Sequence, residues 1–466
     1  MHLPSRSTRV LIPFLAAALT LTACSRPDPG EPSGTASGTA SGTASGTAAP
    51  AGVAGVPGTQ AGRQLRWFLD AAAKPPVADA DLTAHLSADF LADVPPAKLN
   101  ELLGQLAGLR LERVTTSTPA ELTAQVRAGG QSLRLVLGVD ADGKINVLRL
   151  SQADQPSAAP APAAWDEVDR RLRAVAPDVG FLAAEVTADG SCRPVHAVAP
   201  ATPRPIGSIF KLYVLGALTQ SIRMGTLTWD TPLTLAGPMR VPPGELYQRP
   251  VGSKVTVREA AKLMISISDN AATDLLLHAV GRPAVESQVL RWSRHGELNV
   301  PFLTTREFVL LKAARYPELA DAYASLEGER QRRHFLQETV ALESLDGLKD
   351  WSEPRHVGTV EWFGSPEDVC RAFARLSGVG GEELGRVMSA NDAGLGLDGK
   401  TWTTTWYKGG SEVGVLAMGF LARSAAGKTY VVTALTSDPR RAYDEAKAGS
   451  ELLSLIRGSF ALLAKG

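Results

Sequence analysis

The sequence has little cysteine, no net charge and no long hydrophobic run. Three cysteines in 466 residues are too few for a fold held together mainly by disulfides. The 48 Lys and Arg residues balance 48 Asp and Glu residues, so the net charge gives no support for a nucleic-acid binder, which is expected to be basic. The seven histidines never fall at metal-ligand spacing, so we expect no metal site. What is present is globular composition, with 44% hydrophobic and 21% charged residues.

The first 24 residues have the pattern of a targeting segment. Arg6 and Arg9 precede an apolar run over residues 10–23, which is too short to span a bilayer. The run ends in Leu21-Thr22-Ala23-Cys24, which resembles a bacterial lipobox. This resemblance implies lipidation at Cys24, and we therefore expect an extracytoplasmic protein that is lipid-anchored to the bacterial cell membrane. An ordinary secretory signal with a chance cysteine is the alternative.

Changes in composition divide the rest of the chain. Residues 25–62 are rich in repeated Ser-Gly-Thr-Ala and predict a flexible linker. Residues 63–151 combine helical spacing with alternating segments, which predicts a small α+β domain with an accessory or docking role. Residues 152–164 form a Pro/Ala linker. Residues 165–466 begin and end with strand patterns, which predicts an α+β domain whose antiparallel sheet carries an inserted helical lobe.

The first motif with chemical content is Ser208-Ile-Phe-Lys211, which opens an apolar helical segment. Residues i and i+3 share one face of a helix, so Lys211 projects beside Ser208. A serine hydroxyl needs an adjacent base to act as a nucleophile, and a buried lysine can lose its proton near neutral pH. We interpret Ser208 as the nucleophile and Lys211 as its general base. A serine helix cap beside an ordinary surface lysine is the alternative.

Two further motifs follow at long spacing. Ser268-Asp269-Asn270 interrupts an apolar helical run, and either caps a helix or supplies Ser268 as a proton relay and Asn270 as a substrate ligand. Lys408-Gly409-Gly410-Ser411 ends one strand pattern before the next, and either forms an ordinary strand end or binds substrate. In the second interpretation Lys408 attracts a carboxylate, the glycines admit the substrate backbone, and the Ser208 and Ser411 N–H groups form an oxyanion hole.

These three motifs, in this order, resemble the S-x-x-K, S-D-N and K-T-G set of the serine β-lactamase and penicillin-binding-protein superfamily, in its class A-like branch. Glycine replaces the threonine of K-T-G. The sequence also resembles the two-domain serine hydrolases related to the Orf12 protein of clavulanic acid gene clusters. This resemblance rests on the small domain ahead, on PFLTTREFVLLK at 301–312 and on WYKGGSEVGVL at 406–416. That group pairs a cone-like, isomerase/cyclase-like N-terminal fold with a β-lactamase-like domain, and its activity on β-lactams can be weak.

The class A glutamate that activates the deacylating water has no clear counterpart. Its motif is a Glu, two residues and then Leu-Asn, whereas here Glu297 directly precedes Leu298 and Asn299. Glu297 is the one nearby candidate. Without this base the sequence predicts a long-lived acyl-enzyme at Ser208.

Three other features carry weaker expectations. The interval from Ser268 to Lys408 is 140 residues, and its charged stretch between about Arg315 and Trp362 is either a solvated surface helix or a lid. Tyr407, beside Lys408, is a candidate pocket residue. No spacing argument pairs Cys192 with Cys370, so we expect two free thiols.

The sequence therefore predicts a serine hydrolase that acts by acyl-enzyme chemistry on a small molecule, either a β-lactam or a related amide or ester. A D,D-peptidase or esterase on the same fold is one alternative. A slowly deacylating penicillin-binding or sensor protein is the other. We expect no cofactor and no nucleic-acid partner.

Overall fold

The computed structural model describes residues 19–22, 56–106, 108–118, 120–128, 131–140, 142–152 and 160–465. The chain separates into two compact units, Met1–Pro156 and Ser157–Gly466. Cys24 and most of the linker expected over 25–62 lie outside the described residues. Helix α1 begins at Gln60, slightly ahead of the domain start expected at residue 63. Within the described part of the chain, no helix is long and apolar enough to cross a membrane.

In its described residues, the first unit is a five-stranded antiparallel sheet with four helices. Its strand order is β1-β5-β4-β3-β2, with β1 (Leu19–Thr22), β2 (Arg110–Ser117), β3 (Glu121–Ala128), β4 (Gln131–Val139) and β5 (Ile145–Gln152). The helices are α1 (Gln60–Ala73), α2 (Asp79–His85), α3 (Ala88–Asp93) and α4 (Pro96–Gln105). Apolar residues of the helices and of alternate strand positions form one buried cluster, among them Phe68, Leu122 and Leu135. This is the α+β arrangement expected from the sequence.

The second unit is built on a second five-stranded antiparallel sheet. Its strand order is β12-β13-β14-β6-β7, with β6 (Asp178–Val186), β7 (Cys192–Val198), β12 (Trp402–Glu412), β13 (Val415–Ser424) and β14 (Thr429–Ser437). Phe181 of β6 pairs with Ala434 of β14, so strands from the two ends of this region lie side by side. The predicted sheet, closed by both ends of the region, is confirmed.

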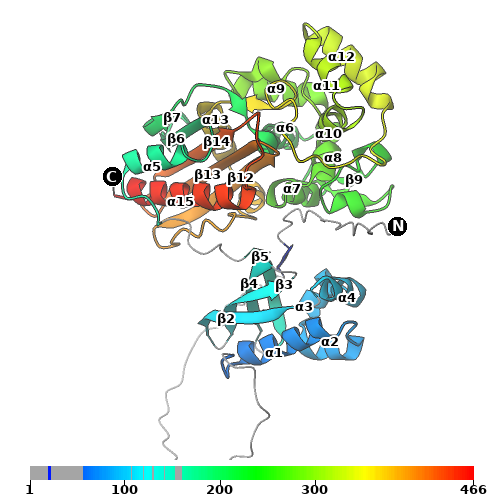
Figure 1. The fold of residues 1–466 in the computed structure, drawn as a ribbon, viewed down its shortest axis with the longest axis vertical. Coiled ribbons are helices and arrows are strands. Elements are labelled where there is room, and N and C mark those ends of the chain that lie inside the picture. The colour runs from blue at the N-terminus through cyan, green and yellow to red at the C-terminus, as the bar shows by residue number, and fades with distance from the viewer. Residues whose placement is uncertain are drawn as a thin grey trace, which may run out of the picture. The chain divides into compact units, whose positions relative to one another are not determined.

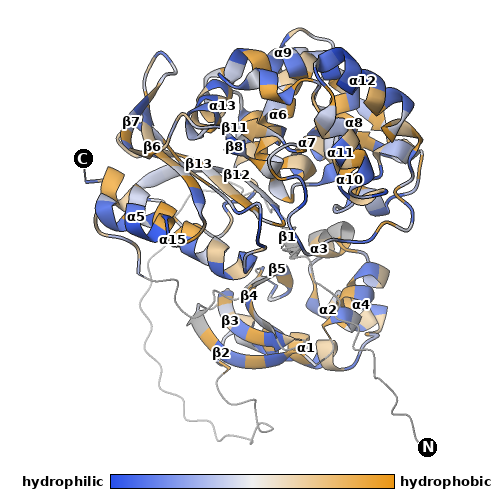
Figure 2. Cartoon of the chain, turned by 45° about the horizontal axis from the view of Figure 1, so that its top comes forward, coloured by the Kyte–Doolittle hydropathy of each residue, from blue (hydrophilic) through white to orange (hydrophobic). Residues whose placement is uncertain are grey.

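Helices cover both faces of this sheet (Figure 1). α5 (Trp165–Leu172) and α15 (Glu445–Leu463) pack together, and Arg171 forms a bidentate ion pair with Glu451. Figure 2 shows that α15 carries both hydrophobic and hydrophilic residues, as expected for a helix with one face on a core. A separate apolar cluster joins the sheet to the inserted helices.

The inserted lobe is helical, as expected. Its helices are α6 (Lys211–Arg223), α7 (Val257–Ser266), α8 (Asn270–Val280), α9 (Arg282–Trp292), α10 (Thr305–Ala313), α11 (Glu318–Ser325), α12 (Glu329–Glu338), α13 (Pro366–Val379) and α14 (Glu382–Met388). The region also contains two short antiparallel strand pairs, which are β8 (Arg204–Pro205) with β11 (Phe363–Gly364) and β9 (Pro232–Thr234) with β10 (Lys254–Thr256).

The expectation of two free thiols is wrong. Cys192, at the start of β7, and Cys370, on α13, form a disulfide with their Cα atoms 6.4 Å apart. The bridge is possible because α13 packs against β6 and β7. The two cysteines are 178 residues apart, and neither helical nor strand periodicity reveals a contact at that separation.

Candidate active site

Ser208 and Lys211 lie one turn apart at the entrance to α6. Ser208 belongs to the short 3-10 helix η1 (Gly207–Phe210), which leads directly into α6 at Lys211. Lys211 is fully buried, whereas Ser208 is only half-buried. Within the part of the chain that the structure describes, the Ser208 hydroxyl has no hydrogen-bond partner. A serine that is accessible beside a buried lysine is the arrangement expected of a nucleophile and its base.

The Lys211 ammonium group contacts the second motif. Its Nζ lies 3.0 Å from Ser268 Oγ, 2.5 Å from the Ser268 carbonyl oxygen and 2.8 Å from Asn270 Oδ1. Burial lowers the pKa of Lys211 from 10.5 to about 7, although the nearby carboxylates of Asp269 and Asp274 oppose this shift. A substantial fraction of Lys211 is therefore neutral near pH 7, as a general base requires.

The second motif both caps a helix and contributes to the site, and Asp269 provides the cap. It is the N-cap of α8 and accepts the Ala272 N–H at 2.8 Å. It also accepts the backbone N–H groups of Glu245 at 2.6 Å and Leu246 at 2.9 Å. Because Asp269 performs the capping, the side chains of Ser268 and Asn270 are available to Lys211.

Ser268 is held in an unusual backbone conformation. Its φ is +59°, in the left-handed region that residues other than glycine rarely adopt. Such strain persists only where the surrounding structure fixes it, and it is common at active sites. Here the residue after Ser268 is held in the core, because the Asp269 carboxylate accepts the Leu246 N–H. The Ser268 carbonyl oxygen is held as well, because it accepts a hydrogen bond from Lys211. In this conformation the Ser268 hydroxyl oxygen lies within hydrogen-bond distance of two lysines.

Lys408 is the second of these lysines. It lies on β12, the edge strand nearest η1, and its Nζ lies 3.0 Å from Ser268 Oγ and 2.6 Å from the Gly409 carbonyl oxygen. Burial, followed by repulsion from Lys211, lowers the pKa of Lys408 well below its ordinary value. An anionic group entering beside Lys408 would oppose this shift and favour the charged lysine. Lys408 is therefore suited to hold a substrate carboxylate.

The glycines allow β12 to touch η1. A Cβ atom at Gly410 would lie 2.6 Å from the Ser208 nitrogen and 2.8 Å from the Gly207 carbonyl carbon. A Cβ atom at Gly207, whose φ is +46°, would lie 3.1 Å from the Ser411 nitrogen. The backbone nitrogens of Ser208 and Ser411 therefore border one close contact between the strand and the helix. This is the placement that an oxyanion hole requires.

Glu297 is not brought into this group. It lies on a 3-10 helix, η4 (Gly296–Asn299), where its side chain is exposed. Among the described residues the Glu297 side chain forms no hydrogen bond or ion pair. Its neighbour Asn299 is buried and binds the backbone of Phe363 through Nδ2 and Oδ1. Tyr407 lies beside the site, because a Cβ atom at Gly409 would collide with its hydroxyl group.

Sequence reasoning missed two groups of residues around the site. Asp274 is buried on α8 and accepts the N–H groups of Thr305 and Arg306, which fixes the start of α10 beside Asn270. Lys312, Glu361 and Glu412 form a buried charged cluster next to Ser411. The one available signal in the sequence was a charged residue at a position where the helix or strand pattern predicts burial. That signal does not identify the residue with which the charge is paired.

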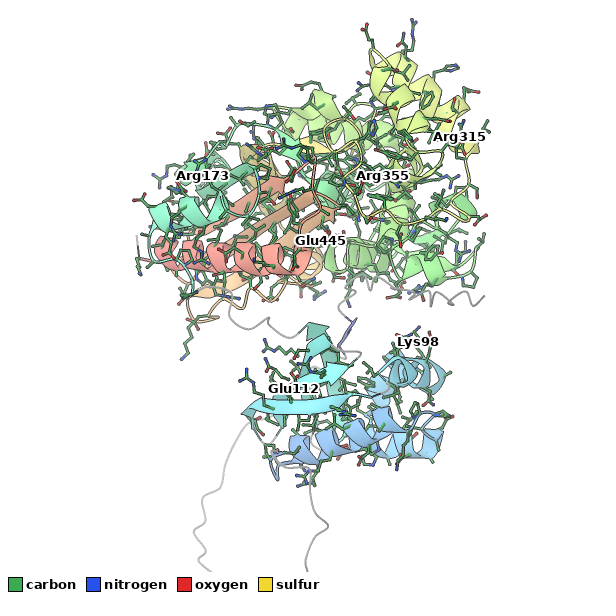
Figure 3. All side chains as sticks on the ribbon, in the orientation of Figure 1. Lys98, Glu112, Arg173, Arg315, Arg355 and Glu445 are labelled. Carbon is green, nitrogen blue, oxygen red and sulfur yellow. A yellow bond between two sulfur atoms is a disulfide. The ribbon has the colours of Figure 1, made fainter. Side chains whose placement is uncertain are left out.

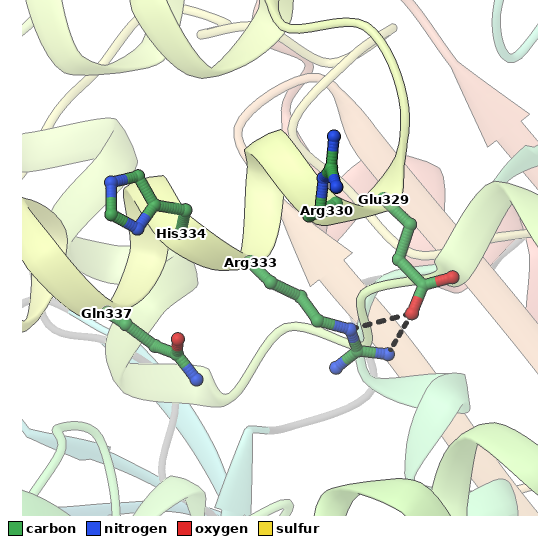
Figure 4. A pocket seen from close by; sticks show the side chains of 5 residues that line it. All are labelled: Glu329, Arg330, Arg333, His334 and Gln337. Carbon is green, nitrogen blue, oxygen red and sulfur yellow. Dashed lines mark hydrogen bonds and ion pairs between the residues drawn. The ribbon is translucent and has the colours of Figure 1, made fainter.

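The described residues hold no metal-binding cluster, and a surface hollow is lined by residues outside the three motifs. No group of three His, Cys, Asp or Glu side chains in the described ranges could hold a metal ion. One surface hollow lies on α12 and is lined by Glu329, Arg330, Arg333, His334 and Gln337 (Figure 4). All five residues belong to one exposed charged helix, and Arg333 is already paired with Glu329. The motif residues lie elsewhere.

Family models match both units. Residues 165–314 match the beta-lactamase enzyme family, and residues 56–145 match the ORF 12 gene product N-terminal family. The two matches confirm the resemblance drawn from the motifs, to the serine β-lactamase and penicillin-binding-protein superfamily. More particularly, the chain joins an Orf12-like N-terminal region to a β-lactamase-like, α+β region.

The chain is also similar to solved structures. One is described as PBP-A, with 16% identity, coverage of 66% of this chain and 100% of that chain, and a TM-score of 0.43. A second is a β-lactamase from Sphaerobacter thermophilus, with 17% identity, coverage of 65% and 98%, and a TM-score of 0.44. A third is a β-lactamase from Chitinophaga pinensis, with 15% identity, coverage of 65% and 98%, and a TM-score of 0.42. A search of curated proteins finds no match.

Proposed function

We propose that this protein is an extracytoplasmic serine hydrolase that forms an acyl-enzyme at Ser208 with β-lactams or related amides and esters. The observation that carries the proposal is the buried Lys211. Its ammonium group contacts Ser268 and Asn270, and it lies one turn from an accessible serine. The pKa of about 7 allows it to accept the Ser208 proton.

The acylation step follows from these contacts. Neutral Lys211 takes the proton from Ser208 Oγ as this oxygen attacks the substrate carbonyl carbon. The Ser208 and Ser411 N–H groups stabilise the negative oxygen, and one such donor is worth about 2.7–4 kcal/mol in the transition state. Ser268 then passes a proton from Lys211 to the leaving nitrogen or oxygen. Asn270 binds the substrate amide, Lys408 binds its carboxylate, and Gly409 and Gly410 admit its backbone.

Slow deacylation is part of the proposal. The one sequence candidate for the deacylating base, Glu297, is exposed and makes no contact with the proposed machinery in the described residues. Water then lacks the carboxylate that would take its proton, and the acyl-enzyme is long-lived. This observation favours the slowly deacylating penicillin-binding or sensor protein as the second candidate function.

The proposed location rests on two features. The lipobox-like segment ending at Cys24 implies a lipid anchor. The Cys192–Cys370 disulfide supports an oxidising compartment outside the cytoplasm, because such bonds are rare in reducing compartments.

Intact-mass spectrometry of the chain from residue 25 onward, mixed with a penicillin and a cephalosporin, tests the proposal. We expect a stable adduct that Ser208→Ala loses. Consumption of the drug without an adduct, again lost in Ser208→Ala, would indicate rapid turnover and contradict slow deacylation. Neither an adduct nor consumption would contradict the β-lactam substrate and leave a D,D-peptidase or esterase to be tested with peptide and ester substrates.

A further inference from the structure

A buried cluster of three charges lies directly beside the proposed oxyanion hole. Lys312 of α10 lies with its Nζ 3.4 Å from Glu361 Oε1, and it also forms an ion pair with Glu412. The exposed fractions of the three side chains are 0%, 0% and 6%. The Lys312 Nζ also lies 4.6 Å from the centroid of the Phe308 ring. Arg355, labelled in Figure 3, donates to the Lys312 carbonyl oxygen.

Stability alone does not account for this cluster. Removing charges from water is costly, and replacing a buried ion pair with apolar residues of similar volume is often neutral or stabilising. Two carboxylates face one ammonium group, so the cluster is not charge-balanced when all three side chains are ionised. Burial and the neighbouring Glu361 raise the pKa of Glu412, which favours its neutral form.

Each carboxylate is connected to one side of the oxyanion hole. Glu412 directly follows Ser411 on β12 and, because side chains alternate along a strand, shares a face with Lys408 and Gly410. Glu361 directly precedes Trp362, and the Trp362 carbonyl oxygen accepts the Ile206 N–H at 2.9 Å. Ile206 leads into η1 and Ser208. Lys312 therefore joins the strand that carries one donor to the segment that supports the other.

We propose that Lys312, Glu361 and Glu412 are positioning residues that set the separation between the Ser208 and Ser411 backbone N–H groups. The proposal rests on the acyl-enzyme function of Ser208 proposed above. The cluster does not touch the substrate. It acts through the backbone of β12 and of the segment before η1, and its effect belongs to the transition state, in which the oxyanion forms.

Substitutions at Glu412 test the proposal in the full-length protein. Glu412→Ala removes the link to β12 and leaves Lys312 and Glu361 as a balanced pair. Glu412→Gln keeps a side-chain oxygen for Lys312 and resembles the neutral carboxylic acid. Glu412→Leu fills the volume without an acceptor, and serves if Glu412→Ala fails to fold. Glu382→Ala, which removes an exposed carboxylate of α14, is the matched control.

The measurements are the first-order acylation rate constant with a penicillin, the dissociation constant of the preceding non-covalent complex, and the affinity for a phenylboronic acid. A boronic acid forms a tetrahedral anion on a serine and occupies the oxyanion hole. We expect Glu412→Ala and Glu412→Leu to lower the acylation rate and the boronic acid affinity about 10–100-fold. The non-covalent dissociation constant should remain unchanged, and Glu412→Gln and Glu382→Ala should stay close to wild type.

Wild-type acylation rates and boronic acid affinity in folded Glu412→Leu would overturn the inference. An equal loss in Glu412→Gln would also overturn it, because the lost property would then be the charge and not the link. If the wild-type protein forms no adduct that Ser208→Ala lacks, the proposed function fails, and this inference fails with it. An adduct that forms normally in every Glu412 variant refutes the positioning role alone.

Discussion

Adding a single methyl group at Gly410 should separate the two halves of the oxyanion hole. In Gly410→Ala the new Cβ would lie closer than 3.0 Å to the Ile206 carbonyl oxygen, the Ser208 nitrogen and the Gly207 carbonyl carbon. All three are backbone atoms, so no side chain can rotate to relieve the contact. β12 and η1 must move apart by about 1 Å, and a misplacement of that size can lower a rate about 100-fold.

The assay is the second-order rate constant for acylation by a penicillin, followed by intact mass. We expect Gly410→Ala to lower it about 100-fold, with a stability loss of about 1–3 kcal/mol from overpacking. Gly399→Ala is the control, because a Cβ atom there meets nothing within 4 Å. Gly409→Ala should have an intermediate effect, since its main obstacle is the Tyr407 hydroxyl. A folded Gly410→Ala protein that acylates at the wild-type rate would refute the oxyanion-hole geometry.

Three further predictions follow from the site and the fold. The acylation rate should rise with pH through about 7, because Lys211 must be neutral to take the Ser208 proton; a rate independent of pH from 5 to 9 would contradict its role as base. Glu297→Gln should leave both acylation and adduct lifetime unchanged in time-resolved mass spectrometry, because this side chain is exposed and bonds to no motif residue in the described structure. An adduct lifetime extended tenfold would show that Glu297 activates water after all. The double substitution Cys192→Ser and Cys370→Ser should lower the free energy of unfolding by about 2–4 kcal/mol in denaturant titrations, and equal midpoints for the two proteins would be incompatible with a bridge closing so long a loop.

The sequence identified best those residues that are close to each other along the chain or that belong to a known set of motifs. The i, i+3 spacing of Ser208 and Lys211 becomes a helical turn, and the strand pattern around Lys408 becomes β12. The sequence also left Ser268, Asp269 and Asn270 between capping and chemistry. The structure divides the roles: Asp269 caps α8, and its two neighbours face Lys211.

The features that sequence reasoning missed depend on contacts between distant segments. The Cys192–Cys370 bridge requires α13 to lie across the sheet, and no periodic pattern encodes that packing. Lys312 pairs with Glu412, which lies 100 residues further along the chain. Nothing in the helical pattern of α10 distinguishes Lys312 from an ordinary surface lysine. Glu297 could be doubted from its motif, but its exposure follows from how Asn299 anchors η4 to β11.

The pairing of β6 with β14 has a consequence for the order in which the protein acquires activity. Phe181 and Ala434 are neighbours in the sheet although about half of the chain separates them. β12 joins this sheet only through β13 and β14, so Lys408 and the Ser411 N–H reach Ser208 after the last strands have docked. Pairings at such separation make folding slow. Consider a nascent chain in which Ser208, Lys211 and Lys408 have been synthesised but β14 has not. This chain should contain every reactive side chain and still be catalytically inactive.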